Sequence, residues 1–222
     1  MNGADDAADN ACQGGVAVLG GTFDPIHFGH LRSALELRER LGCGQVRLIP
    51  CHRPPHRDTP AVSGEQRLRM VELAVAGDSG LVADARELRR PGPSYTIDTL
   101  IELRAELGAR CPLYLVMGVD AFALLDGWWR WRELLDFAHI VVIARPDCAL
   151  PQSGAVAGLL AAHGAAVDTL RTRSHGGIAT LQLTPLPISA TAIRALIRAG
   201  RSPRYLLPDA VQAFISAQRL YC

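Results

Sequence analysis

The chain has 222 residues, a length that suits one domain with a substantial hydrophobic core. Its 23 basic residues are all arginine and are balanced by 22 acidic ones, so the net charge of +1 favours neither a nucleic-acid partner nor a membrane surface. The six cysteines are scattered without a Cys-x-x-Cys pair, which predicts reduced thiols in a cytoplasm rather than a disulfide framework or a zinc site.

The first 14 residues are polar and acidic, and we expect them to form a disordered tail. They lack the apolar segment of a signal peptide, and no run of 18 apolar residues follows them. The sequence therefore predicts neither a secretion signal nor a membrane span. We expect a single domain over residues 15–222.

A motif with two glycines and two histidines follows the apolar residues 16–19, which predict the first strand. Glycines at a strand-to-helix junction let backbone N–H groups close on an anion, and the helix N-terminus adds partial positive charge. His27 and His30 are three residues apart and can share one face of the first helical turn. An ordinary turn with two polar residues is the alternative. We interpret the combination as a phosphate site formed by Gly20, Gly21, Thr22, Phe23, His27 and His30.

Strands and helices alternate along the rest of the chain. Short apolar runs bounded by turn residues predict strands at residues 45–50, 81–84, 113–118, 139–145 and 180–183. Helical periodicity predicts helices at 31–41, 64–77, 97–107, 156–163, 189–199 and near 211–215. The alternation predicts an α/β doubly wound parallel sheet, with a C-terminal helical part at about 188–222 and a ligand at the switch point above the first strand.

Polar groups follow several of the predicted strands, where ligands of open α/β sheets bind. His56 and Arg57 lie on a proline-bearing loop after the second strand, for which a solvated basic loop is an equal alternative. Because the nearby Cys51 and His52 have no matching second pair, this loop does not predict a metal site. Asp120 follows the strand at 113–118 and can accept hydrogen bonds from ribose hydroxyls. Arg145 is the last residue of the strand at 139–145, which Pro146 stops.

Two further segments carry candidate site residues. Ser94 and Thr96 precede the helix at 97–107, where a hydroxyl is well placed to cap it and can still contact a ligand. All three tryptophans lie within residues 128–131, which suits either core packing or a platform for stacking a planar ring. Ser189 is expected to cap the helix that carries Arg194.

The chemistry of these groups indicates phosphate binding. No activated serine or cysteine, carboxylate pair or protein-held metal triad stands out. Glycine-loop amides, both histidines, Ser189 and Arg194 could instead hold a triphosphate. We therefore expect in-line attack by a substrate phosphate on the α-phosphorus of a nucleoside triphosphate, with Mg²⁺ held by substrate oxygens and water.

The segments His27-Phe28-Gly29-His30 and Ile188 to Arg194 resemble the two motifs of the nucleotidylyltransferase superfamily, which has a Rossmann-like fold. With residues 54–57, 94–96, 117–120, 127–131 and 205–208, the chain resembles the bacterial nicotinate-nucleotide adenylyltransferases over nearly all of its length after residue 15. It departs from them in Arg57, where lysine is common, and in the uninformative stretch 149–178.

This resemblance implies adenylyl transfer from ATP to nicotinate mononucleotide, giving nicotinate adenine dinucleotide and pyrophosphate in NAD biosynthesis. It assigns catalysis to His27, His30 and Arg194, and ATP binding to these three together with Gly20, Gly21, Thr22, Phe23, Gly118, Asp120 and Ser189. Acceptor binding falls to His56, Arg57, Thr96 and Trp128, to which we add Arg145.

Two alternatives remain open. One is a sibling adenylyltransferase that uses nicotinamide mononucleotide or phosphopantetheine, although the tryptophan and Ser-Tyr-Thr segments favour the first reading. The other is a non-catalytic nucleotide-binding regulator, which could have lost a histidine or Arg194. We expect Mg²⁺ to accompany ATP, and the sequence leaves the oligomeric state open, a homo-oligomer included.

Overall fold

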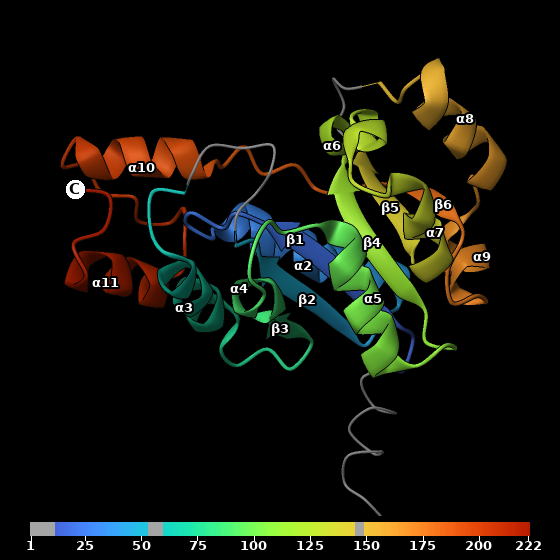
Figure 1. Ribbon diagram of the computed structural model, residues 1–222. Coiled ribbons are helices and arrows are strands. Elements are labelled where there is room, and N and C mark those ends of the chain that lie inside the picture. The colour runs from blue at the N-terminus through green and yellow to red at the C-terminus, as the bar shows by residue number, and fades with distance from the viewer. Residues whose placement is uncertain (1–11, 53–59, 145–148) are drawn as a thin grey trace, which may run out of the picture. The chain divides into compact units, whose positions relative to one another are not determined.

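The strands form one six-stranded sheet in the order β3-β2-β1-β4-β5-β6 (Figure 1). The computed structural model describes residues 12–52, 60–144 and 149–222. Because the strand order reverses between β1 and β4, the predicted doubly wound α/β sheet is confirmed, with its switch point beside the first strand. The strands are β1 (Val16–Gly21), β2 (Gln45–Pro50), β3 (Leu81–Ala83), β4 (Leu113–Gly118), β5 (His139–Ala144) and β6 (Ile178–Gln182).

Parallel pairing and continuous burial explain why these runs form strands. Val16 pairs with Leu113 between β1 and β4, and Tyr114 pairs with His139 between β4 and β5, both in parallel register. Nearly all side chains of β4 and β5 are buried, as expected for strands covered on both faces. The bounds of β2 and β4 match the predicted runs, and β5 begins at the predicted residue, whereas β1 continues through both motif glycines. Arg145, the predicted end of β5, lies outside the described residues.

Most helices lie where the sequence predicts them. These are α2 (Phe28–Leu41), α3 (Gly64–Val75), α5 (Thr96–Leu107), α8 (Gly154–His163), α10 (Ala190–Arg198) and α11 (Asp209–Ala217). The short elements α4 (Arg86–Arg89), α6 (Val119–Ala123), η1 (Leu125–Gly127), η2 (Trp131–Glu133), α7 (Leu134–Phe137) and α9 (Val167–Arg171) were not predicted, because one or two turns give too little periodicity to recognise.

Of the two predicted helix caps, the cap of α10 is confirmed and the cap of α5 is wrong. Ser189 caps α10 as expected, since its hydroxyl accepts the N–H of Ala192 at 3.2 Å. The predicted hydroxyl cap of α5 is wrong: the capping position is Tyr95, which makes no side-chain capping bond. The Ser94 hydroxyl instead accepts the backbone N–H of His52 at 2.9 Å.

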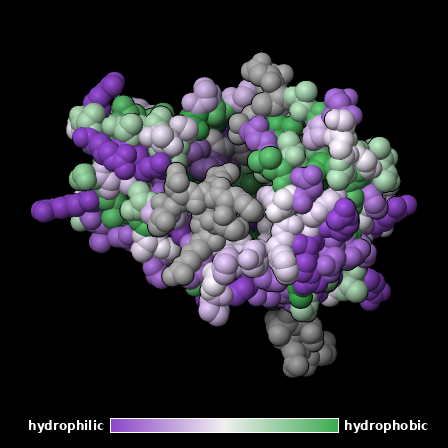
Figure 2. Space-filling model, turned by 45° about the horizontal axis from the view of Figure 1, so that its top comes forward, coloured by the Kyte–Doolittle hydropathy of each residue, from purple (hydrophilic) through white to green (hydrophobic). Residues whose placement is uncertain are grey.

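The chain divides into two compact units, which are described separately. Of the described residues, those within 12–19, 36–47 and 95–183 make up the first unit, and those within 20–35, 48–94 and 184–222 make up the second. Helices α3 and α11 of the second unit pack side by side (Figure 1). Polar and apolar residues are interspersed on the face shown in Figure 2. No helix in the described part of the chain is long and apolar enough to cross a membrane.

A disulfide joins Cys12 to Cys111 in the first unit, which corrects the expectation that the cysteines are reduced thiols. The two Cα atoms are 5.6 Å apart although the residues are 99 positions apart in sequence. They meet because β1 and β4 pair in parallel, so the segments that lead into the two strands lie side by side. Spacing along the sequence carries no sign of this contact. Among the other described cysteines, Cys43, Cys51 and Cys222 form no disulfide.

Candidate active site

His27 and His30 form a stacked pair where β1 leads into α2, in the second unit. Their ring centroids are 3.7 Å apart and the ring planes differ by 22°. The Phe23 ring is buried and meets His30 edge-on at 5.1 Å, so it holds the outer imidazole face in place. Among the described residues, neither Nδ1 atom has a hydrogen-bond partner, although both atoms are buried. The expected common face of the two histidines is therefore present.

Burial keeps both imidazoles neutral near pH 7. It lowers the pKa of His27 from 6.5 to about 4. The pKa of His30 falls to about 3, chiefly through burial and further through the neighbouring His27. A neutral imidazole offers one N–H donor and one acceptor nitrogen. Two such rings beside a glycine loop can donate to phosphate oxygens without bringing fixed charge.

The three glycines of this segment differ in why the position has no side chain. A Cβ at Gly29 would lie 3.0 Å from the His27 ring, so the glycine between the histidines makes room for that imidazole. A Cβ at Gly21 would meet the Phe23 ring at 3.0 Å, whereas one at Gly20 would meet nothing within 4 Å. Close packing explains Gly29 and Gly21, and Gly20 leaves open space over the backbone at the end of β1.

Arg194 is attached to the motif through Asp24. Its Nη1 donates to the main-chain oxygen of Asp24 at 2.6 Å and lies 3.8 Å from that residue's Oδ2. Its Nη2 is 3.4 Å from the Thr191 hydroxyl, and its Nε is buried without a partner in the described part of the chain. The structure thus joins the two sequence motifs, because α10 presents its arginine to the loop that precedes the histidines.

Arg67 holds the exits of the first two strands together, a role that the sequence analysis missed. This α3 side chain is only 1% exposed. Nη1 donates to the Thr22 oxygen at 2.8 Å, and Nη2 donates to the Cys51 oxygen at 2.7 Å. The guanidinium therefore binds two main-chain carbonyl oxygens, one just after β1 and one just after β2. Periodicity alone assigned this helix no functional side chain.

The first unit carries the other predicted ATP residues. Gly118 is the last residue of β4 and the capping position of α6, and a Cβ there would meet nothing within 4 Å. Asp120 lies exposed in the first turn of α6. Both positions stand at the carboxyl end of a central strand, where ligands of open α/β sheets bind.

The structure brings two predicted acceptor segments together in the same unit. Tyr95 and Trp129 contact each other with ring centroids 6.0 Å apart, so the turn before α5 lies against the tryptophan segment. Trp131 is 8% exposed and serves the core, whereas Trp129 is 61% exposed. Trp128 is half-buried, and Thr96 is half-buried at the start of α5. His56, Arg57 and Arg145 lie outside the described residues.

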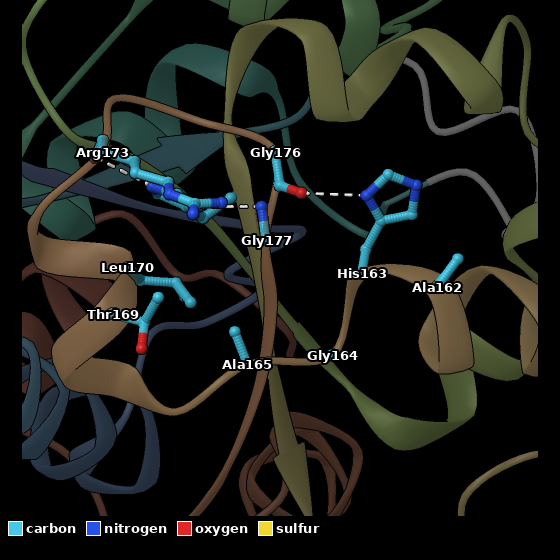
Figure 3. Close-up of a pocket in the computed structure, with 10 residues that line it drawn as sticks. Ala162, His163, Gly164, Ala165, Thr169, Leu170, Arg173, Gly176 and Gly177 are labelled. Carbon is cyan, nitrogen blue, oxygen red and sulfur yellow. Dashed lines mark hydrogen bonds between the residues drawn. The ribbon is translucent and has the colours of Figure 1, made fainter.

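Two cavities accompany these groups. One of about 410 Å³ in the second unit is lined by His52, Ser63 and Arg67 among others. The other, of about 150 Å³ in the first unit, lies at the amino end of β5 (Figure 3), at the opposite edge of the sheet from Gly118. Its wall is internally bonded: the Nδ1 of His139 accepts the N–H of Gly177 at 3.0 Å. No predicted site residue lines this second cavity.

The chain matches the cytidylyltransferase-like family model over residues 18–196. A protein of Pseudomonas putida (strain W619) named "Probable nicotinate-nucleotide adenylyltransferase" is 53% identical over 206 residues, which cover 93% of this chain and 94% of the relative. A protein of Cellvibrio japonicus with the same name is 52% identical over 206 residues, covering 93% and 98%.

A solved structure gives the same fold. The nicotinic acid mononucleotide adenylyltransferase of Plasmodium falciparum, complexed with NaAD, matches with a TM-score of 0.68, covering 93% of this chain and 96% of the other. The two sequences are 15% identical, so this match concerns the fold. The expected Rossmann-like architecture is therefore confirmed over almost the whole chain.

Proposed function

The chain belongs to the cytidylyltransferase-like family and, within it, to the nicotinate-nucleotide adenylyltransferases, and we propose that it transfers the adenylyl group of ATP to nicotinate mononucleotide. The acceptor's phosphate oxygen forms a bond to the α-phosphorus, and the bond from that phosphorus to the β-phosphate oxygen breaks. Nicotinate adenine dinucleotide and pyrophosphate result, a step of NAD biosynthesis. The observation that carries the proposal is the neutral histidine pair at the β1–α2 junction, beside the loop that Arg194 contacts.

The histidines and Arg194 are suited to the charge that develops during this transfer. Negative charge moves onto the leaving phosphate oxygens as the bond breaks, so donors aimed there bind the transition state more strongly than ATP. Neutral His27 and His30 each offer an N–H, and Arg194 adds a fixed positive charge. Burial of the imidazoles lowers the local dielectric and strengthens each of these hydrogen bonds.

Mg²⁺ would enter with ATP and neutralise charge on the phosphate oxygens. No cluster of three or more metal-ligating side chains is found among residues 12–52, 60–144 and 149–222. At the histidine motif, His27, His30 and Arg194 offer donors suited to phosphate. The protein's own part is to bind and orient the triphosphate.

Acceptor recognition is proposed for the tryptophan segment and its neighbours. Trp128 is half-buried and can offer a ring face to the pyridine, while Thr96 begins the helix that Tyr95 ties to this segment. We assign His56, Arg57 and Arg145 to the acceptor from the sequence alone. Asp120 and Gly118 are proposed for the ATP ribose side, and Gly20, Gly21, Thr22, Phe23 and Ser189 for its phosphates.

The decisive experiment is turnover on a panel of acceptors. The protein is incubated with ATP, Mg²⁺ and, separately, nicotinate mononucleotide, nicotinamide mononucleotide and phosphopantetheine, and both pyrophosphate and the adenylylated product are measured. We expect nicotinate mononucleotide to give the highest kcat/KM. A preference for another acceptor assigns the sibling activity, and pyrophosphate release with none of them refutes the proposal.

A further inference from the structure

The Asp24 carboxylate collects contacts from three distant parts of the second unit. Asp24 is 5% exposed. Oδ1 accepts the Tyr221 hydroxyl at 2.7 Å, and Oδ2 accepts the Ala61 N–H at 2.8 Å. The main-chain oxygen of Asp24 accepts the Arg194 guanidinium. One residue of the motif loop is thus bonded to the start of the α3 segment, to α10 and to the end of the chain.

Tyr221 is buried like a core side chain. It is 7% exposed, and its φ of 66° lies in the left-handed backbone region, which residues other than glycine rarely adopt. The adjacent Leu220 is also buried and donates its N–H to the Ile215 oxygen at 3.0 Å. Its hydroxyl joins this segment to the histidine motif loop through the hydrogen bond to Asp24.

We propose that Tyr221 is a positioning residue for adenylyl transfer: its hydroxyl fixes the Asp24 carboxylate, and the fixed Asp24 orients Arg194 toward the phosphates. This inference rests on the proposed function. The C-terminal end of the chain then belongs to the reaction machinery without touching a substrate. Burial, with the Asp24 carboxylate beside it, raises the pKa of Tyr221, so the hydroxyl keeps its proton and remains the donor.

The geometry says how loss of the hydroxyl would reach Arg194. Without it, Oδ1 of a buried carboxylate is left unpaired, which favours a rotated carboxylate that finds another donor. One charged donor stands close by, because Nη1 of Arg194 lies 3.8 Å from Oδ2. If the guanidinium moved from the main-chain oxygen to the carboxylate, it would no longer point toward the phosphates. A displacement of about 1 Å in an active site can lower the rate about 100-fold.

The test compares Tyr221→Phe with Tyr205→Phe, a matched control in the same unit whose ring is exposed. Phenylalanine keeps the buried ring and removes only the hydroxyl. We expect Tyr221→Phe to lower kcat roughly 10- to 100-fold and to change the KM for ATP less than about threefold. Tyr205→Phe should keep both constants. A folded Tyr221→Phe protein with kcat within twofold of the unaltered enzyme overturns the inference.

A double-variant cycle separates positioning through Arg194 from a general structural effect. If Tyr221 acts through Arg194, adding Tyr221→Phe to Arg194→Ala should lower kcat little further. Losses that multiply fully would show that Tyr221 acts by another route and would overturn the inference. If Tyr221→Phe fails to fold, Asp24→Asn is measured instead in the same cycle, with the same two outcomes.

The two proposals fail in different ways. An unaltered protein that releases no pyrophosphate with any acceptor refutes the proposed function, and this role of Tyr221 falls with it. An active unaltered protein whose Tyr221→Phe variant is equally active refutes the positioning role alone.

Discussion

His27 and His30 combine a stacked geometry with neutral rings, and this combination decides what their loss should do. Donors that meet charge only as it develops contribute to turnover more than to binding. His30→Ala should therefore lower kcat by roughly 10²–10³-fold, about 3–4 kcal/mol, with a smaller loss of ATP affinity. Pyrophosphate release, ATP titration and thermal melting of the variant measure the three quantities.

The exposed His163, in the first unit, gives a matched control for this prediction. His163→Ala should keep both turnover and ATP affinity. His27→Ala should act in the same sense as His30→Ala, and the two losses should be less than additive if both rings act on one developing charge. A folded His30→Ala protein with nearly normal turnover contradicts the catalytic assignment.

The same lowered pKa values make stability depend on pH. The unfolded histidines titrate near 6.5, whereas folded His27 and His30 titrate at about 4 and about 3. Below pH 6.5 the unfolded chain binds more protons, so stability that is complete above 6.5 is lost as the pH falls toward 4. We expect each histidine to cost on the order of 1–2 kcal/mol of unfolding free energy at pH 5.

Urea unfolding at pH 7.5 and pH 5.0 checks this expectation. The double variant His27→Gln/His30→Gln should lose less stability between the two pH values than the unaltered protein. His139 is also buried with a lowered pKa, so part of the pH dependence should persist in the double variant. Equal losses in both proteins would show that the motif histidines titrate normally in the folded state.

At the scale of elements, Arg67 connects two strand exits and predicts a kinetic effect from a buried side chain. A lysine ammonium cannot reach the Thr22 and Cys51 oxygens in the fixed geometry of a guanidinium. Arg67→Lys should destabilise the protein by about 1.5–3 kcal/mol and displace the loop whose amides we propose to bind the phosphates. We expect kcat/KM for ATP to fall roughly tenfold.

Arg104 in the first unit gives a stringent control, because it also caps carbonyl oxygens. Its guanidinium donates to the oxygens of Phe137, Cys111 and Ser174. These acceptors stand beside the amino ends of β4 and β5, remote along those strands from Gly118. Arg104→Lys should lower the melting temperature while leaving kcat/KM for ATP within twofold. If the two variants have the same kinetics, the role of Arg67 is structural only.

The tryptophan segment carries a prediction about the acceptor. Trp131 serves the core and Trp129 packs on Tyr95, which leaves the half-buried Trp128 as the ring proposed to stack on the pyridine. Trp128→Ala should weaken the acceptor by about 1–3 kcal/mol and leave ATP affinity nearly intact. Separate KM values for the two substrates measure this. An effect found in Trp129→Ala instead would show that the wrong ring was chosen.

Sequence patterns located the large elements because their signals are local. Apolar runs ended by breakers marked β2, β4 and β5, and a hydroxyl before an amphipathic stretch marked the cap of α10. The cap of α5 was mispredicted because the Ser94 hydroxyl pairs with His52, 42 residues earlier in the chain. The residues next to Ser94 in the sequence give no sign of this partner, because the contact forms only in the folded chain.

The residues of the candidate site also differ in whether a local sequence signal identifies them. Its histidines and Arg194 belong to short motifs that can be identified from their spacing. The side chains that hold these groups cannot, because Arg67 looks like an ordinary helical arginine and Tyr221 is 197 residues from its partner Asp24. Supporting side chains of this kind act through hydrogen bonds that exist only once the chain is folded.

At the scale of the whole chain, the disulfide and the histidine motif lie at opposite ends of β1. Cys12 precedes the strand and pairs with Cys111 before β4, whereas the motif follows the carboxyl end of β1. A covalent link that closes a loop of about 100 residues restricts mainly the unfolded chain, by about 4.7 kcal/mol in the chain-entropy model. The link should therefore affect stability much more than turnover.

Breaking this link by Cys12→Ser should lower the free energy of unfolding by about 2–5 kcal/mol, since the unfolded chain regains the freedom that the loop removed. Reductant should produce the same loss in the unaltered protein and none in the variant. The value of kcat should stay within twofold in both, because Cys12 and Cys111 precede the amino ends of β1 and β4, whereas the histidine motif and Gly118 lie at the carboxyl ends of these strands. Cys222→Ser, which replaces an exposed free thiol, serves as the matched control and should unfold like the unaltered protein.

Thiol titration of the unfolded, unreduced chain gives an independent check: two of the six cysteines should fail to react. Six reactive thiols, with equal stability in the presence and absence of reductant, would show that Cys12 and Cys111 lie close together without a bond.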